Sequence, residues 1–163
     1  MILDYETIFM EAQSPVDTSG STDITTGTSI SVNVLDTGPR DADNSTIDFA
    51  AGQDWFFFFL VTTEADSAAD GASVNVRLVS SAAATLGTPT VHYQTGVLVE
   101  ATFAVGYTLK IRPAADQNWL RYVGVDFLIT GENLTAFACT ALLTDRVDVL
   151  RQYAIGTNTN PVT

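Results

Sequence analysis

The chain is short and strongly acidic: its 163 residues include seven Lys or Arg and nineteen Asp or Glu, for a formal net charge of −12 at pH 7. A chain of this length folds as one domain around a single hydrophobic core, without needing a disulfide or a metal. Its charge repels phosphate backbones and anionic lipid surfaces, which argues against nucleic acid or a membrane as a direct partner. The same charge suits either simple solubility or a partner with a basic surface.

The amino-terminal sequence lacks the features of a secretory signal, because Asp4 and Glu6 stand where such a signal needs positive charge. The longest apolar stretch, residues 55–61, is much shorter than the roughly 20 residues that span a bilayer as a helix. We therefore expect neither secretion nor membrane insertion.

Nine short segments with strand character recur along the chain, separated by polar or glycine-containing turns. They are residues 7–12, 29–35, 55–63, 72–80, 89–94, 97–104, 107–112, 120–130 and 134–143. This spacing predicts an all-β domain, either a sandwich or a barrel.

Two segments differ in how their apolar residues are arranged. Residues 72–78 alternate, which predicts that Val74, Val76 and Leu78 face the core while the opposite face is solvated. Residues 55–61 are apolar without alternation, so both faces of that strand must be covered, one by a second sheet and the other by a loop or a partner subunit.

A long β-hairpin is predicted over residues 109–130. Leu109 and Ile111 alternate with basic residues and are expected to face inward, Pro113 ends the strand, and residues 114–118 form the turn before the return strand.

Several segments are predicted to lie outside the strands. Residues 37–45 and 64–71 have the Gly, Pro, Asp and Ser content of loops, and residues 19–27 and 156–163 are too polar to build core. After Thr144 the apolar spacing fits either a helix or an extended arm, and both remain open.

Candidates for metal binding and catalysis are few. One histidine and one cysteine cannot form a zinc site. His92 lies in an alternating strand, where a solvent-facing role is more common than that of a general base. Cys139 has no Lys, Arg or His near it in sequence, which favours a small buried hydrophobe over a reactive thiol.

Other functional patterns are weak. The acidic residues 41–48 lack the glycine and glutamate positions of an EF-hand loop, so a solvated loop is the simpler interpretation. No carboxylate pair stands out for glycoside hydrolysis, and no phosphate-binding glycine loop or nucleophile elbow is present. Trp55, Trp119 and Tyr122 could stack on sugars, but aromatics in such strands are more often core or interface anchors. We expect no catalytic residue, no cofactor and no metal.

Several stretches of the sequence are similar to one known family. They are residues 1–4 (Met-Ile-Leu-Asp), 36–41 (Asp-Thr-Gly-Pro-Arg-Asp), 72–78, 118–123 (Asn-Trp-Leu-Arg-Tyr-Val), 140–145 and 153–156. Through them the chain resembles the cement, or capsid-decorating, proteins of tailed bacteriophages, in particular the Bordetella phage cement-protein family. The resemblance implies an antiparallel jelly-roll β-sandwich over residues 1–145, followed by a C-terminal arm or tail over residues 146–163.

The resemblance also implies a function. It predicts a structural virion protein on the outer surface of the capsid, a homodimer that bridges neighbouring major capsid protein subunits without a cofactor. The alternatives are a carbohydrate-binding or tail-associated adhesin sandwich and a glycan hydrolase. The candidate interface residues are Met1, Ile2, Leu3, Asp4, Tyr5, Arg40, Asp41, Trp55, Trp119, Arg121 and Tyr153.

Overall fold

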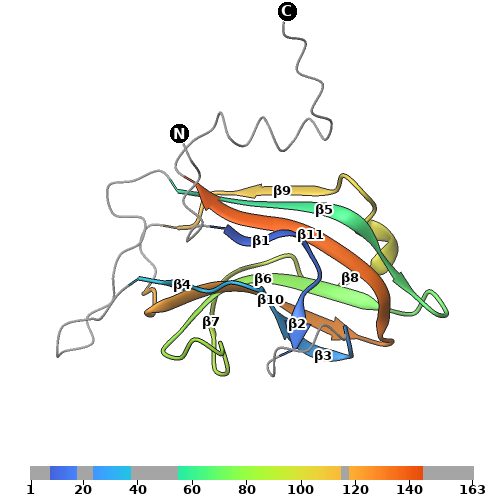
Figure 1. Ribbon diagram of the computed structural model, residues 1–163, viewed down its shortest axis with the longest axis horizontal. Coiled ribbons are helices and arrows are strands. Elements are labelled where there is room, and N and C mark those ends of the chain that lie inside the picture. The colour runs from blue at the N-terminus through green and yellow to red at the C-terminus, as the bar shows by residue number, and fades with distance from the viewer. Residues whose placement is uncertain (1–7, 18–23, 38–54, 115–117, 145–163) are drawn as a thin grey trace, which may run out of the picture.

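Two antiparallel β-sheets pack face to face and form the body of the protein (Figure 1). The computed structural model describes residues 8–17, 24–37, 55–114 and 118–144. Its strands are β1 (Ile8–Gln13), β2 (Val16–Asp17), β3 (Gly27–Ile30), β4 (Leu35–Asp36), β5 (Phe56–Ser67), β6 (Ser73–Ser81), β7 (Thr90–Gln94), β8 (Leu98–Val99), β9 (Thr108–Ile111), β10 (Tyr122–Thr130) and β11 (Leu134–Thr144). A 3-10 turn, η2 (Glu100–Thr102), follows β8.

The strand order identifies the architecture. The smaller sheet has the order β1-β11-β5-β9, and the larger has the order β2-β3-β10-β6-β7, with β4 also paired to β10 and β8 to β6. When the two-residue strands β2, β4 and β8 are set aside and the others are numbered 1 to 8 along the chain, the sheets read 1-8-3-6 and 2-7-4-5. This is the order of a jelly roll. The predicted all-β, antiparallel jelly-roll sandwich is therefore confirmed.

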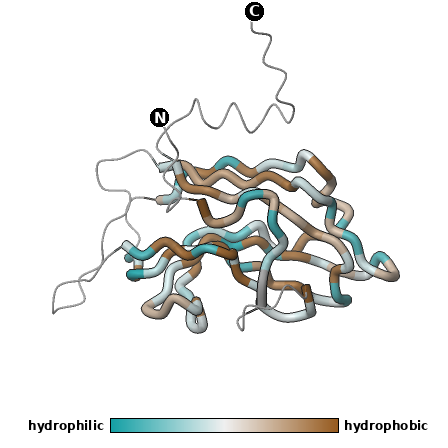
Figure 2. Tube along the Cα trace, viewed as in Figure 1, coloured by the Kyte–Doolittle hydropathy of each residue, from teal (hydrophilic) through white to brown (hydrophobic). Residues whose placement is uncertain are grey.

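The main hydrophobic core lies between the two sheets, where apolar residues line the facing strands (Figure 2). Val74, Val76 and Leu78 of β6 are fully buried, and Leu109 and Ile111 of β9 pack against the same core from the other sheet. The predicted inward faces of both strands are thus confirmed.

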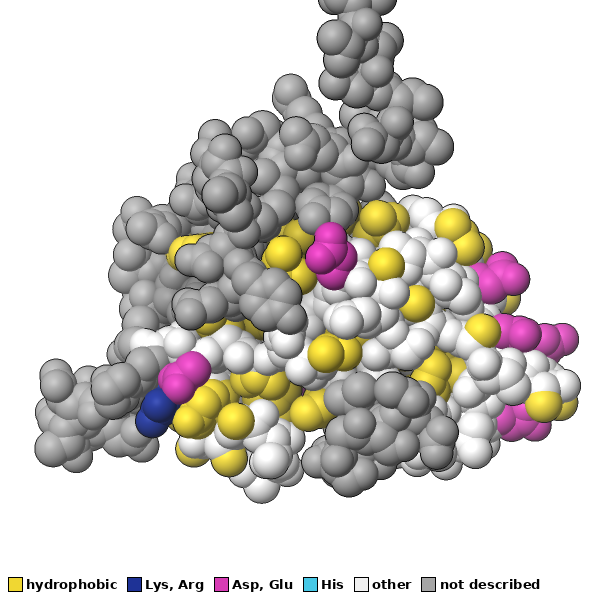
Figure 3. Space-filling view, viewed as in Figure 1, with side chains coloured by type: hydrophobic (Ala, Val, Ile, Leu, Met, Phe, Trp, Pro, Cys, Tyr) yellow, Lys and Arg dark blue, Asp and Glu magenta, His cyan; other side chains and the backbone are white. Residues whose placement is uncertain are grey.

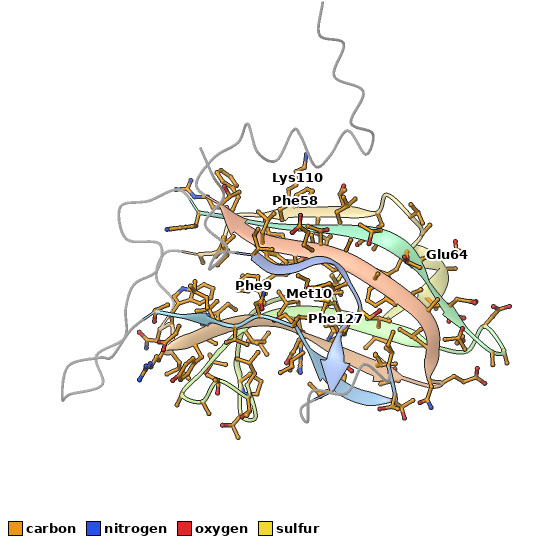
Figure 4. The ribbon with its side chains drawn as sticks, in the orientation of Figure 1. Phe9, Met10, Phe58, Glu64, Lys110 and Phe127 are labelled. Carbon is orange, nitrogen blue, oxygen red and sulfur yellow. The ribbon has the colours of Figure 1, made fainter. Side chains whose placement is uncertain are left out.

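Aromatic side chains tie the two layers together. The Phe127 ring of β10 lies 6.3 Å from that of Phe59 in β5 and 5.8 Å from that of Phe137 in β11, measured between centroids. Phe9, Met10 and Phe127 occupy the space between the sheets in Figure 4.

Strand β5 is buried on both faces. Phe57 and Phe59 belong to the main core, whereas Phe58 is fully buried in a second cluster with Ile8 and Leu142 on the outer face of the smaller sheet. This arrangement confirms the two-sided burial expected from the unbroken apolar run.

The predicted hairpin over residues 109–130 is wrong. Strand β9 pairs with β5 in the smaller sheet, while β10 pairs with β3, β4 and β6 in the larger one. Both strands have an apolar face, and these faces meet across the core instead of lying side by side. The chain between them crosses from one sheet to the other.

Two element boundaries also differ from expectation at one end of the sandwich. The predicted loop over residues 64–71 is strand as far as Ser67, because Ala65 and Ser67 of β5 are both buried. The predicted strand over residues 97–104 stops at Val99 and turns through η2, which places the fully buried Phe103 in the core.

Corrections apply to the segments around β3 as well. Residues 19–27 do contribute to the core, because Ile24 is buried in it, and Gly27 begins β3 with a φ of +122°. The predicted strand over residues 29–35 is divided between β3 and β4, which both pair with β10. The predicted arm, residues 146–163, lies outside the described residues.

The face of β6 that points away from the main core is not simply solvated, as the alternation had suggested. Asn75 is buried and its Nδ2 donates to Gln94 Oε1 at 3.3 Å, while Arg77 is paired with Asp126. Val79 packs against Ile30 and Leu86 in a third apolar cluster. Side chains of β3 and β10, and Leu86 from the segment between β6 and β7, therefore cover part of this face.

Candidate interaction surfaces

Only three of the candidate interface residues fall within the described part of the chain. The others lie outside it: Met1, Ile2, Leu3, Asp4, Tyr5, Arg40, Asp41 and Tyr153. Trp55, immediately before β5, is half-buried and packs against the main core. Most of its surface therefore serves the fold.

Trp119 is fully buried, so it is corrected from a surface contact to a core residue. The His92 ring stacks on it, with centroids 3.6 Å apart and the ring planes 18° from parallel. His92 is accordingly half-buried and not solvent-facing, because its ring covers the indole. The proposed sugar-stacking platform also loses this aromatic.

His92 also forms a hydrogen bond that resembles part of a catalytic pair. Its Nε2 lies 2.6 Å from Ser80 Oγ, and Ser80 Oγ accepts the Leu120 backbone N–H at 2.9 Å. Ser80 is fully buried, so a substrate cannot reach this hydroxyl in the folded conformation. The contacts hold β6, β7 and the crossing segment before β10 together.

Among the three described candidates, Arg121 is the one with an accessible charged group. Its Nε and Nη2 donate to Asp36 Oδ1 and Oδ2, both at 2.7 Å, and the pair is partly exposed beside β4 and β10. The guanidinium carbon lies 4.9 Å from the centroid of the Tyr122 ring. The hydrogen bond to Asp36 raises the pKa of Arg121 further, so the group remains cationic. Its charge is nevertheless largely compensated by Asp36.

Cys139 has the environment expected of a packing residue. It is fully buried in the main core, and its Sγ lies 3.7 Å from Met10 Sδ. Burial raises the pKa of the thiol far above its ordinary value. The prediction of an inert, buried thiol is confirmed.

An acidic pocket lies at one end of the sandwich, between the end of β5 and η2. It has a volume of about 510 Å³ and is lined by Glu64, Ala65, Asp66, Asp70, Val99, Glu100 and Ala101. Acidic side chains gather at this end of the molecule in Figure 3, and Figure 4 places Glu64 on β5 beside it. The pocket was not predicted from the sequence.

Glu100 is the distinctive residue of this acidic pocket. Its backbone is fixed, since its N–H donates to Ala72 O at 3.1 Å and its carbonyl accepts the Phe103 N–H at 2.8 Å. Only 5% of the residue is exposed, and neither carboxylate oxygen has a hydrogen-bond partner among the described residues. Buried carboxylates normally have such partners.

Two further findings concern metal binding and membrane-spanning helices. Within the described ranges, no group of three or more His, Cys, Asp or Glu side chains is arranged to hold a metal ion. No helix in the same part of the chain is long and apolar enough to cross a membrane.

Comparison with known proteins assigns the chain to a family. The Bbp16 family model matches residues 19–143, which is most of the chain. The chain belongs to the Bbp16 family. Bbp16 is a Bordetella phage protein family, and the match to it runs from just after β2 to the penultimate residue of β11, so it covers most of the jelly roll. A search of curated proteins finds no match to this chain.

Proposed function

We propose that this protein is a structural virion protein that decorates the outer surface of a phage capsid and cements neighbouring major capsid protein subunits together. The observation that carries the proposal is membership of the Bbp16 phage family across most of the jelly roll. The resemblance of residues 36–41, 72–78 and 118–123 to cement proteins gives the more specific role.

The described residues support a role through surfaces more than one through catalysis. The hydroxyl–imidazole pair of Ser80 and His92 is enclosed by packing, and the Cys139 thiol is buried. Among the described residues, the accessible charged features include the Asp36–Arg121 ion pair and the acidic pocket, and the pocket is suited to recognising a cationic group.

Cementing follows from mass action. A protein that binds the assembled shell, but not its separated subunits, stabilises the shell by its binding free energy. A specific interface needs to bury only about 1,200–2,000 Å² in total, and a homodimer that engages two subunits at once gains further affinity by linking the two binding events. The two-layer sandwich supplies a rigid body for such a bridge, because its strands are held from both sides of the core.

Cosedimentation with bare shells assembled from the major capsid protein of the same phage tests the proposal. We expect saturable binding, a higher melting temperature of the decorated shell, and density for this jelly roll on the outside of the particle by electron microscopy. Light scattering of the free protein tests the homodimer. Failure to bind the shells would contradict the proposed function, and specific binding to an isolated glycan would favour the adhesin alternative.

A further inference from the structure

The acidic pocket concentrates negative charge, and no described Lys or Arg lies in its lining to compensate it. Four carboxylates line it, from Glu64, Asp66, Asp70 and Glu100, whereas none of the described Lys or Arg residues does so. Arg77 and Arg121 are each held by an aspartate elsewhere, and Lys110 is on β9 opposite Phe58 of β5, away from the Glu64 end of that strand. The local excess of negative charge is therefore a property of this end of the sandwich.

Glu100 is the carboxylate in this pocket at which a cation would be held. Its two carboxylate oxygens are buried, lack hydrogen-bond partners among the described residues, and belong to a residue that lines the pocket. Removing a carboxylate from water without replacing its hydrogen bonds is unfavourable. A ligand that brought hydrogen-bond donors and positive charge to Glu100 would supply the missing hydrogen bonds and also balance the negative charge.

The geometry also selects among cations. A metal ion requires several oxygens at bonding distance around one point, and the described carboxylates form no such group. The pocket, at about 510 Å³, instead has room for the end of a long side chain. A guanidinium presents five N–H donors over a planar group, and it can pair with one carboxylate in a bidentate manner while contacting others.

We propose that the acidic pocket is a socket for a cationic side chain of a partner protein, preferably arginine, which pairs with Glu100 at the base of the pocket. Glu64, Asp66 and Asp70 attract the cation and contact it nearer the opening. That the partner is the major capsid protein rests on the proposed function, but the preference of the pocket for a cationic side chain does not.

A peptide titration tests the socket without any shell. The probe is the capped tripeptide Gly-Arg-Gly, added to the full-length, isotope-labelled protein while amide chemical shifts are recorded. We expect saturable shifts confined to residues 64–70 and 99–101, with a dissociation constant on the order of 1 mM. Capped Gly-Lys-Gly should bind more weakly and capped Gly-Gln-Gly should not bind.

Matched variants locate the contact. Glu100→Gln keeps the shape of the side chain and should weaken Gly-Arg-Gly binding at least tenfold. Glu11→Gln, an exposed residue of β1 outside the pocket, makes the same change of charge and should leave binding unchanged. Because Glu100 is buried, its substitution could also disturb the fold. The double variant Glu64→Gln/Asp70→Asn changes two exposed residues of the pocket instead, and it should also weaken binding.

The same variants are then titrated onto bare shells. Loss of at least tenfold in affinity for Glu100→Gln and the double variant, but not for Glu11→Gln, supports the socket. Equal shell binding by all of them, together with an absence of peptide shifts, overturns the socket and leaves the proposed function intact. If the unaltered protein does not bind shells, the proposed function fails, and the peptide titration still decides the socket. If calcium causes larger changes in the amide chemical shifts than Gly-Arg-Gly does at equal concentration, the socket would also be overturned.

Discussion

Arg77 and Asp126 face each other directly across the pairing of β6 with β10, and two hydrogen bonds join them. Arg77 Nε donates to Asp126 Oδ1 at 2.6 Å, and Nη2 donates to Oδ2 at 2.7 Å. The Asp126 side chain is completely buried, whereas that of Arg77 remains 18% exposed. Removal of Arg77 therefore leaves a fully buried charge without its partner, whereas removal of Asp126 leaves a charge that is partly exposed to solvent.

We expect Arg77→Met to lower the free energy of unfolding by about 3–5 kcal/mol at neutral pH, because it leaves the buried Asp126 carboxylate unpaired. Asp126→Asn should cost less, since the remaining Arg77 guanidinium can extend toward water. Urea unfolding of both variants measures the difference. Equal losses would show that the burial of Asp126 is not the dominant cost.

The same pair predicts a dependence on pH. Burial raises the pKa of Asp126 above the ordinary value of 3.8, and the hydrogen bond from Arg77 opposes this rise. Since the folded-state pKa is the higher one, the native state binds the proton more tightly than the unfolded chain does. The contribution of Asp126 to stability therefore falls as pH rises from 3.8 through the raised value.

Arg77→Met removes the hydrogen bond that opposes the rise in the pKa of Asp126. The substitution should therefore widen the pH range over which the contribution of Asp126 to stability falls. The deficit in unfolding free energy relative to the unaltered protein should then shrink as pH falls into the window. Urea unfolding of both proteins over the acidic range provides the measurement. A deficit that does not change with pH would contradict the assignment to Asp126.

Two glycines with positive φ provide a matched test of backbone packing. Gly131, between β10 and β11, has a φ of +86°, and an added Cβ would collide with the Gly71 carbonyl oxygen. Gly96 has a φ of +75° and open space around the same position. We expect Gly96→Ala to cost about 1–2 kcal/mol from backbone strain alone. Gly131→Ala should cost about 2–5 kcal/mol, because steric overlap adds to the strain. Thermal unfolding distinguishes them, and equal losses would argue against the close approach of Gly71.

Val76→Asp tests the centre of the core. The substitution would bury an unpaired carboxylate between the sheets, at a cost of several kcal/mol against a total stability of about 5–15 kcal/mol. We expect the variant to be unfolded by circular dichroism, whereas Thr108→Asp, at an exposed position of β9, should fold. A folded Val76→Asp protein with an unchanged melting temperature would refute the inward assignment of this strand face.

Salt should act mainly on the rate of capsid association. If acidic surfaces steer the protein toward basic patches on the shell, added salt screens charges beyond a Debye length of about 8 Å at physiological ionic strength and slows binding. The dissociation rate should change less. Surface plasmon resonance on immobilised bare shells gives both rates, and equal effects on the two would argue against electrostatic steering.

Local patterns were sufficient to predict the layers of this fold. The alternation of Val74, Val76 and Leu78 predicted an inward face, and the unbroken apolar run through Phe58 predicted two-sided burial, because both signals depend on neighbours within one strand. Pairing between strands was harder to predict. Leu109 pairs with Phe59 of β5 rather than with the next strand along the chain, and no local signal encodes that choice.

The candidate sites were harder still to predict. From the sequence alone, Trp119 was predicted to be an exposed interface anchor. Its burial is explained only by the His92 ring of β7, which stacks on it. The acidic pocket joins Glu64 to Glu100, which belong to segments that were predicted as a loop and a strand. The alternation of Glu64 and Asp66 around Ala65 was a usable signal for a strand edge, but the burial of Glu100 depends on the η2 turn.

The position of β11 has a consequence for how the protein is made. This strand is the last of the jelly roll, yet it lies inside the smaller sheet, between β1 and β5 (Figure 1). On the ribosome, β1 and β5 must wait for residues 134–144 to emerge before the sheet that contains them can close. Pairings over such long sequence separations slow folding. The nascent chain therefore cannot complete the core around Phe9, Phe57 and Phe59 until synthesis has passed Thr144, and a chaperone that binds exposed aromatic strands would find its substrate in that interval.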